Sequence, residues 1–257
     1  MKSLLLRMEL TSREFWSGYW RNKSDEFKLP IQSEYLFTPL FRKEIEQMKP
    51  QNAVELGGFP GTFSIYLNKY FQLPTTLVDY FIDDELLRQF MHANGLKTGE
   101  LTWQEADILT EGLAHDTYDF VFSIGLIEHF EDTTQILKSH VKYVNKGGSL
   151  LIVLPNFRGI NGWFQRNFDI ENYNKHYIQC MDPQLLVNEL KNLGCTNIDA
   201  GYFAKFSIWL ENYNTQPAWV KALFKATWTM GKIISKILPI DSKLFSPYIQ
   251  IRAQVPQ

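Results

Sequence analysis

The chain has 257 residues, of which 45% are hydrophobic and 21% are charged. This length and composition are typical of a globular protein with a large core and argue against a disordered chain. The chain has 26 basic and 28 acidic residues, which gives a net charge of −2. No overall positive charge therefore favours nucleic acid as a partner.

Neither export nor a membrane span is predicted. The first ten residues, MKSLLLRMEL, hold only three consecutive apolar residues before Arg7, too few for the apolar core of a signal peptide. No stretch reaches the roughly 18 consecutive apolar residues of a spanning helix. The two cysteines, Cys180 and Cys195, lack CxxC spacing and the density of a disulfide framework. We therefore expect a cytoplasmic protein.

The N-terminal region carries an aromatic segment, EFWSGYW, but no predicted strand. On a helix, Trp16, Tyr19 and Trp20 fall on one face. Two interpretations remain open, a helix packed on the core and a lid over a ligand. We treat residues 1–49 as an N-terminal helical lid, with these three aromatic residues as candidate substrate contacts.

From Ala53 onward, short apolar runs alternate with segments that have helical patterns. Strands are predicted at 53–56, 75–80, 100–106, 118–125, 149–155 and 195–201. Helices are predicted after residue 61 and at 83–95, 132–148 and 182–194, the last with Asp182 as N-cap and Gly194 at its C-terminus. Such alternation predicts an α/β fold, a mostly parallel sheet with helices on both faces.

A glycine turn, ELGGFPG at 55–61, follows the first predicted strand. In open α/β sheets, ligands bind beyond the carboxyl ends of the strands. A P-loop would need a lysine in this turn, but none occurs before Lys69. A dinucleotide fingerprint would need glycine where Phe59 and Thr62 stand. The turn therefore disfavours pyrophosphate binding, and a nucleotide-dependent oxidoreductase with it.

Acidic residues end the first two strands, Glu55 and Asp79. A carboxylate in the second position can accept hydrogen bonds from both hydroxyls of a ribose. A nucleoside without a pyrophosphate fits this combination best. The alternative is that both acids only satisfy amides at helix N-termini.

At this point the chain resembles the class I S-adenosylmethionine-dependent methyltransferases, whose first motif is an acidic residue followed by alternating glycines. The segment ELGGFPG matches at Glu55, Gly57 and Gly61 and departs at the middle glycine, which is Phe59. The segments YDFVFSIGLIEHF and VNKGGSLLIVLPN look like the family's fourth and fifth strands with their turns. The resemblance covers roughly residues 50 to 200.

The resemblance implies a Rossmann-like class I methyltransferase fold of seven strands, the last antiparallel at 247–255. It also implies S-adenosyl-L-methionine as cofactor, S-adenosyl-L-homocysteine as product, and no metal. Asp79 matches the ribose-binding acid, and Asp107, in ADIL, stands where family members bind the adenine amino group; a cap of the following turn is the alternative for Asp107. The candidate cofactor-binding residues are Glu55, Gly57, Gly58, Phe59, Gly61, Asp79, Tyr80, Asp107, Ile108, Ser123 and Gly125.

Methyl transfer from a sulfonium requires an aligned nucleophile and often the removal of one proton. Two histidines are candidate bases: His129, which follows the fourth strand, and His176, in the long connection 156–182. His129 is equally compatible with an orienting hydrogen bond. The sequence has no HExxH or CxxC, so no metal is expected. The connection also supplies the candidate substrate-binding residues Arg158, Trp163, Tyr173 and Tyr177.

A late segment, 217–238, contains no acidic residue. On a helix its lysines, Lys221, Lys225, Lys232 and Lys236, share one face, opposite Trp219, Leu223, Met230, Ile234 and Ile237. One interpretation is a helix packed on the core with its lysines in water. The other is contact with an anionic membrane or a lipid-like substrate.

Together these expectations describe a single methyltransferase domain over 1–257. It comprises the lid 1–49, a core of 50–201 and 245–257, and a helical insertion at 202–244. The predicted reaction methylates an O or N atom, less readily C, of a small, apolar or lipid-like molecule. No nucleic acid is expected, peripheral membrane contact stays open, and a monomer and a homodimer fit equally well. The alternative is a non-catalytic S-adenosylmethionine-binding or scaffold protein.

Overall fold

Seven strands form one sheet in the computed structural model, which describes residues 10–97, 99–110, 117–238 and 240–256. Residues 1–9 of the predicted lid lie outside this part. The strands are β1 Ala53–Leu56, β2 Thr75–Asp79, β3 Thr102–Glu105, β4 Tyr118–Ile124, β5 Val144–Pro155, β6 Thr196–Phe203 and β7 Tyr248–Gln254.

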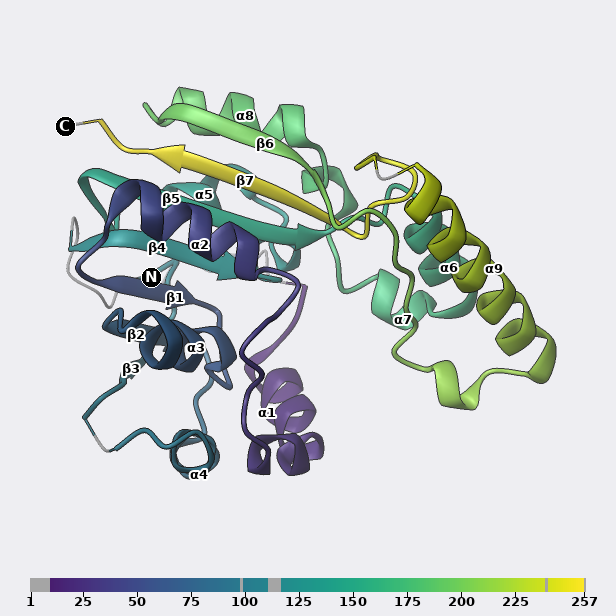
Figure 1. Ribbon diagram of the computed structural model, residues 1–257, viewed down its shortest axis with the longest axis horizontal. Coiled ribbons are helices and arrows are strands. Elements are labelled where there is room, and N and C mark those ends of the chain that lie inside the picture. Colours follow the sequence, from purple (N-terminus) through teal and green to yellow (C-terminus); the bar gives the residue numbers. More distant parts are fainter. Residues whose placement is uncertain (1–9, 98, 111–116, 239, 257) are drawn as a thin grey trace, which may run out of the picture.

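The strands lie in the order β3-β2-β1-β4-β5-β7-β6. The pairs from β3 to β5 are parallel, whereas β7 runs antiparallel to both β5 and β6. The mostly parallel sheet and its antiparallel last strand are thus confirmed. Because the order reverses between β1 and β4, their carboxyl ends open a crevice where ligands bind in such sheets. Helices α6, α7 and α9 lie at the end to which β4 and β5 point (Figure 1).

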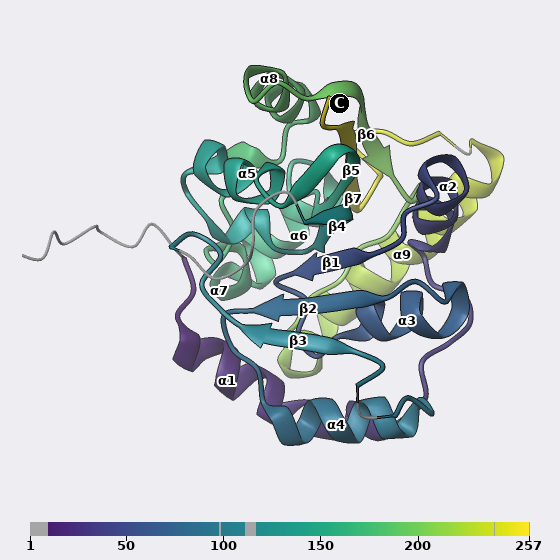
Figure 2. The ribbon, with the colours of Figure 1, turned by 90° about the vertical axis from the view of Figure 1, so that its left-hand side faces the viewer.

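Helices cover both faces of the sheet, as predicted. Phe41 of α2, Tyr66 of α3 and Leu87 of α4 belong to one core cluster, while Ile136 of α5 and Leu186 of α8 belong to the other. Figure 2 shows α5 and α3 on opposite sides of the strands. The helices are α1 Arg13–Asn22, α2 Thr38–Met48, α3 Thr62–Phe71, α4 Asp84–Ala93, α5 Thr133–Val141, α6 Ile160–Phe168, α7 Ile170–Tyr173, α8 Pro183–Asn192 and α9 Ala218–Ile237.

Helix α2 lies inside the segment 1–49 but packs on the sheet rather than over the crevice. Phe41 is fully buried. Glu44 accepts a hydrogen bond from Arg252 of β7 at 2.5 Å, and both side chains are largely buried. Helix α1 is the helix of this segment that borders the crevice, through Trp16, Tyr19 and Trp20.

Two boundaries differ from the sequence prediction by more than two residues. The helix expected over 132–148 ends at Val141, and β5 begins at Val144 rather than at residue 149. The long connection 156–182 contains helices α6 and α7 and a 3-10 turn at Ile178–Cys180. Both cysteines, Cys180 and Cys195, are buried free thiols.

Helix α9 fills much of the predicted insertion and packs through an unexpected face. It buries Val220 and Gly231, and Phe224 contacts Phe164 of α6 with ring centroids 5.6 Å apart. The apolar side opposite the lysines is exposed, with Met230 at 61% and Ile237 at 73%. Helix α9 thus packs on the core, as one of the two interpretations held, but through a side that lies between the lysines and the exposed apolar residues. No helix within the described ranges is long and apolar enough to cross a membrane.

Gly231 explains how α9 approaches its neighbour so closely. A Cβ at this position would lie 2.1 Å from the ring of Phe206. We expect Gly231→Ala to lower the free energy of unfolding by about 1–3 kcal/mol through overpacking, measured by urea denaturation. Gly18→Ala in α1 is the matched control, because nothing lies within 4 Å of its Cβ position. The control should be neutral or stabilise by up to about 1 kcal/mol; equal effects of the two substitutions would contradict this packing.

Candidate functional site

A cavity of about 300 Å³ opens at the carboxyl ends of β1, β2 and β4, under helix α1. Most of the residues predicted to bind a ligand border it. From the strand ends and the loops that follow them these are Glu55, Gly57, Gly58, Phe59, Asp79, Tyr80, Asp107, Ile108 and Gly125. From α1 they are Trp16, Tyr19 and Trp20, and from the segment after β4, His129.

Two predicted cofactor-binding residues do not border the cavity. Gly61 has φ +89° and begins helix α3, where its freedom from a Cβ permits the turn. Ser123 is fully buried and its Oγ is hydrogen-bonded to Nε2 of His140 in α5, at 2.9 Å. Since alternate strand residues face opposite sides of a sheet, Ser123 belongs to the packing of α5 and not to the site.

The aromatic and basic residues of 156–182 also lie outside the cavity lining. Arg158 pairs with Asp182 at 2.6 Å, and Trp163 is half exposed beside Phe168. Tyr173 stacks on Phe157, and the hydroxyl of Tyr177 donates to Gln179. The structure does not bring Arg158, Trp163, Tyr173 and Tyr177 to the cavity, so their contact with a substrate stays a prediction.

Glu55 ties β1 to the start of helix α3. Its carboxylate accepts hydrogen bonds from the backbone N–H of Ser64 at 2.8 Å and from the Ser64 hydroxyl at 2.5 Å. Burial raises the pKa of Glu55 to about 8. Gly58 passes so close that a Cβ there would lie 2.2 Å from Glu55 Cδ. The acid thus fixes the path of the glycine turn, which agrees with the interpretation of a carboxylate at a helix N-terminus.

Asp79 ties the same turn to β2. It accepts hydrogen bonds from the backbone N–H groups of Phe59 at 2.8 Å and Phe81 at 3.0 Å. Burial raises its pKa to about 6 despite these hydrogen bonds. The carboxylate borders the cavity and still has acceptor capacity, because each oxygen accepts more than one hydrogen bond.

Phe59 occupies the position of the middle glycine without blocking the cavity. Its side chain is buried at 2% exposure, and its ring contacts those of Trp20, Phe27 and Phe81. Phe59, the residue that departs from the glycine pattern, therefore packs the turn against α1.

Several residues that line the cavity were not predicted from the sequence. They are Thr11, Pro60, Thr62, Phe63, Ala106, Ile124, Leu126 and Phe130. All but Thr11 lie close in sequence to residues that were predicted, so widening each motif would have found them.

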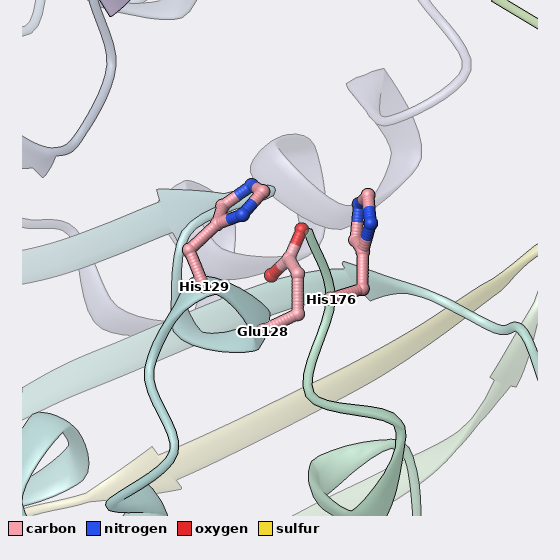
Figure 3. Close-up of side chains that lie close together, drawn as sticks. All are labelled: Glu128, His129 and His176. Carbon is pink, nitrogen blue, oxygen red and sulfur yellow. The ribbon is translucent and has the colours of Figure 1, made fainter. Parts of the chain in front are cut away.

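Beside the cavity, His129 meets His176 and Glu128 (Figure 3). The two imidazole centroids lie 4.9 Å apart, and Trp16 of α1 packs edge-on against His129 at 5.1 Å. Glu128, which was not predicted, is buried at 1% exposure, and its Oε2 has no hydrogen-bond partner among the described residues. The two histidines singled out as candidate bases thus lie side by side, although only His129 reaches the cavity lining.

Burial sets the protonation of this cluster. It lowers the pKa of His129 to about 3 and that of His176 to about 4. Burial also raises the pKa of Glu128 to about 8. Both imidazoles are therefore neutral at pH 7, and they are weak proton acceptors, because a base with so low a pKa holds a proton poorly.

The chain matches a protein family whose description is "Methyltransferase domain". The match covers residues 32–200, about two thirds of the chain. The matched range includes the glycine turn, Asp79, Asp107 and the histidine cluster.

Solved structures share the fold at low identity. A phosphoethanolamine N-methyltransferase 2 of Haemonchus contortus, in complex with phosphomonomethylethanolamine and S-adenosylhomocysteine, has a TM-score of 0.61 and 14% identity over 96% of this chain and 61% of its own. An S-adenosylmethionine-dependent methyltransferase of Archaeoglobus fulgidus has a TM-score of 0.51 and 17% identity, over 95% of this chain and 94% of its own. An O-methyltransferase family protein of Burkholderia thailandensis has a TM-score of 0.52 and 14% identity, over 95% of this chain and 58% of its own. The chain thus spans less than two thirds of the nematode and Burkholderia chains.

The contact between Gly58 and Glu55 gives a prediction for the turn. We expect Gly58→Ala to destabilise the fold by about 1–3 kcal/mol, because the new methyl group overlaps the Glu55 side chain. In a Glu55→Ala background the same change should lower the free energy of unfolding by less. A double-mutant cycle, with unfolding free energies from urea denaturation, measures this coupling. Gly201→Ala, with open space around its Cβ position, is the control. Additive effects of the two changes would show that the side chains do not meet.

Proposed function

The chain belongs to the methyltransferase-domain family and is a class I S-adenosylmethionine-dependent methyltransferase, and from this premise we propose that it methylates an oxygen or nitrogen atom of a small, partly apolar molecule. The cofactor would occupy the cavity at the carboxyl ends of β1, β2 and β4. In the proposal, α1 acts as a lid over the acceptor, and the chain forms one domain with the boundaries expected from the sequence.

The position of Asp79 carries the proposal. It ends β2 at the border of the cavity, at the reversal of strand order where nucleosides bind in such sheets. The pKa of Asp79 is raised from the usual value of 3.8 to about 6. The stability of the ligand-free protein therefore falls as the pH rises from 3.8 to about 6, because the buried side chain of Asp79 resists ionisation. Two ribose hydroxyls donating to the carboxylate would offset this cost.

Aromatic side chains of α1 support an acceptor with apolar surface. Trp16, Tyr19 and Trp20 border the cavity, and Trp16 contacts His129. An N-methyltransferase and an O-methyltransferase family protein occur among the structures of similar fold. Both acceptor atoms therefore remain within the proposal.

Catalysis in this proposal depends mainly on positioning. The cofactor's sulfonium already activates the methyl group, so the protein must align the acceptor atom with the S–CH₃ bond and exclude water. His129 borders the cavity and is neutral at pH 7, which suits it to orient an acceptor N–H or O–H. We assign His129 and His176 as orienting groups rather than strong bases.

The scaffold alternative makes a different prediction about the same cavity. A non-catalytic protein would bind S-adenosylhomocysteine but show no turnover with any acceptor. Loss of turnover in His129→Ala with unchanged affinity for S-adenosylhomocysteine favours the enzyme.

Affinity for S-adenosylhomocysteine should depend on the ionisation of Asp79. Below about pH 6 the protonated carboxyl can accept fewer hydrogen bonds, so we expect Kd to rise up to about tenfold per pH unit between pH 6 and 5. Isothermal titration calorimetry from about pH 5 to 8 measures this dependence. Asp79→Asn should bind more weakly at pH 8 and show no such rise.

The matched control for this titration is Asp83→Asn, because Asp83 caps helix α4 through Leu86 outside the cavity. It should retain the affinity and pH profile of the unchanged protein. A flat affinity of the unchanged protein over the same pH range would contradict the assigned role of Asp79.

We further propose that the exposed side of α9 contacts an anionic membrane at the cytoplasmic face. Apolar residues project from this side, with Trp219 at 63% exposure and Met230 at 61%. Lys225 and Lys236, on the lysine side of the same helix, are also exposed. An amphipathic helix with aromatic and aliphatic groups on one side and lysines on another suits the headgroup boundary, and a lipid-like acceptor would be drawn from there.

Vesicles separate membrane contact from simple exposure. We expect co-sedimentation with vesicles containing about one third phosphatidylserine to exceed that with neutral phosphatidylcholine, since each lysine near the surface contributes about 1 kcal/mol. Lys225→Glu with Lys236→Glu should abolish the difference. Lys138→Glu on α5 together with Lys191→Glu on α8 is the control for total charge, because it also replaces two exposed lysines. Equal binding to neutral and anionic vesicles, or no binding to either, would overturn the proposal.

A further inference from the structure

We infer that Glu128, His129 and His176 form a binding site for one divalent transition-metal ion, of the class of Mn²⁺, Co²⁺ or Zn²⁺. A potential ligand atom from each of the three side chains lies within 4.8 Å of the other two (Figure 3). Two atoms bound to one ion at about 2.1 Å are at most about 4.2 Å apart. Small side-chain rotations therefore suffice to close the site.

Glu128 supplies an observation that points to a cation independently of this spacing. Its side chain is 1% exposed, and within the part of the chain that the structure describes Oε2 has no hydrogen-bond partner. A buried carboxyl oxygen without a partner is costly, and a cation beside it would favour the ionised form that burial disfavours. Its neighbours Cys180 and Tyr248 carry no positive charge, and Lys175 pairs with Glu171 at 3.0 Å. An ion between the three side chains would supply the missing partner.

The histidines are prepared as ligands by their backbone hydrogen bonds. Nδ1 of His129 lies 2.8 Å from the carbonyl oxygen of Lys175, and Nδ1 of His176 lies 2.7 Å from that of Asn172. Because a carbonyl oxygen only accepts, Nδ1 carries the proton in each ring. The other ring nitrogen is left with a lone pair for a ligand, the arrangement usual in metal-binding histidines.

The backbone holds the two contributing segments together. Glu128 and His129 lie on the 3-10 turn Ile127–His129, whereas His176 follows helix α7. The N–H of Tyr177 donates to the carbonyl of Glu128 at 2.6 Å. Two imidazoles and one carboxylate with further positions open suit a first-row transition metal better than Ca²⁺ or Mg²⁺, which prefer oxygen ligands alone.

The site adjoins the cavity, which suggests a use for the ion. His129 borders the cavity, as does Gly125, whose Cβ position lies 3.5 Å from Glu128 Oε1. In a role that rests on the proposed function, the two histidines would orient the acceptor through the ion, and an acceptor hydroxyl bound to that ion would release its proton to water more readily. The resulting oxygen takes the methyl group as the S–CH₃ bond breaks, and S-adenosylhomocysteine leaves. This proposal departs from the sequence-based expectation that no metal is needed.

Metal binding by the whole chain tests the inference directly. After dialysis against EDTA, we expect calorimetric titration with MnCl₂ and with CoCl₂ to give about one ion per chain. Glu128→Gln and His176→Gln should each weaken binding at least about tenfold. His92→Gln is the matched control, because His92 is an exposed histidine on α4 outside the cluster, and it should bind as the unchanged protein does.

Two outcomes would overturn the site: fewer than about 0.2 ions per chain in the unchanged protein, or equal affinity in all variants. Circular dichroism shows which variants fold. If the cluster variants do not fold, the Co²⁺ absorption of the unchanged protein decides. Imidazole ligation shifts and strengthens the bands of aqueous Co²⁺, so an unshifted spectrum rejects the site.

Titration with S-adenosylhomocysteine in EDTA separates the two proposals: retained binding without a metal site leaves the methyltransferase cavity intact, whereas lost binding counts against the cavity.

Discussion

Two buried carboxylates hold the glycine turn against the sheet, and the site depends on them. Glu55 binds the first turn of α3 through Ser64, and Asp79 binds the backbone of Phe59. Both bear the desolvation cost of burial, which raises their pKa values. Because β1 and β2 are parallel neighbours, their carboxyl ends bring these acids to one edge. The turn between them therefore has one path, and the cavity takes its shape from that path.

The same edge gathers the parts that lie far apart in the sequence. Helix α1 adds its aromatic face, and its Arg13 pairs with Glu105 at the end of β3. The turn after β4 adds His129, which His176 reaches from the connection after β5. Asp79 thus lies in one cavity with His129 and Trp16, which gives the proposed site a nucleoside end and a histidine end. In the proposed reaction, the cofactor's methyl group and the acceptor meet between the two ends.

Local periodicity sufficed to predict the sheet and most of its helices, because each strand and helix carries its own signal. Helix α2 lies inside the segment 1–49 that was expected to be helical, but its packing on the sheet was not predicted, because only the distant Arg252 explains the inward Glu44. Ser123 was misplaced because the side of a strand that faces the ligand follows from packing with His140. Glu128 looks like a surface acid in GLIEHFED, and only the return of the chain at Tyr177 buries it.

Helix α9 illustrates the same limit. Its amphipathic pattern is evident in the sequence, but which side meets the protein depends on Gly231 and Phe206, which are separated in the chain and in contact in the fold. The contact turns the apolar side outward. Sequence patterning thus predicted the helix, and tertiary packing decided what it presents to the solvent.

A crystal structure of the complex with S-adenosylhomocysteine would test most directly whether this cavity is the cofactor site. We predict ribose hydroxyls within hydrogen-bond distance of the Asp79 carboxylate, adenine beside Asp107 and Ile108, and the sulfur directed toward His129 beneath Trp16. A ligand bound elsewhere, or one whose ribose does not reach Asp79, would contradict the assignment.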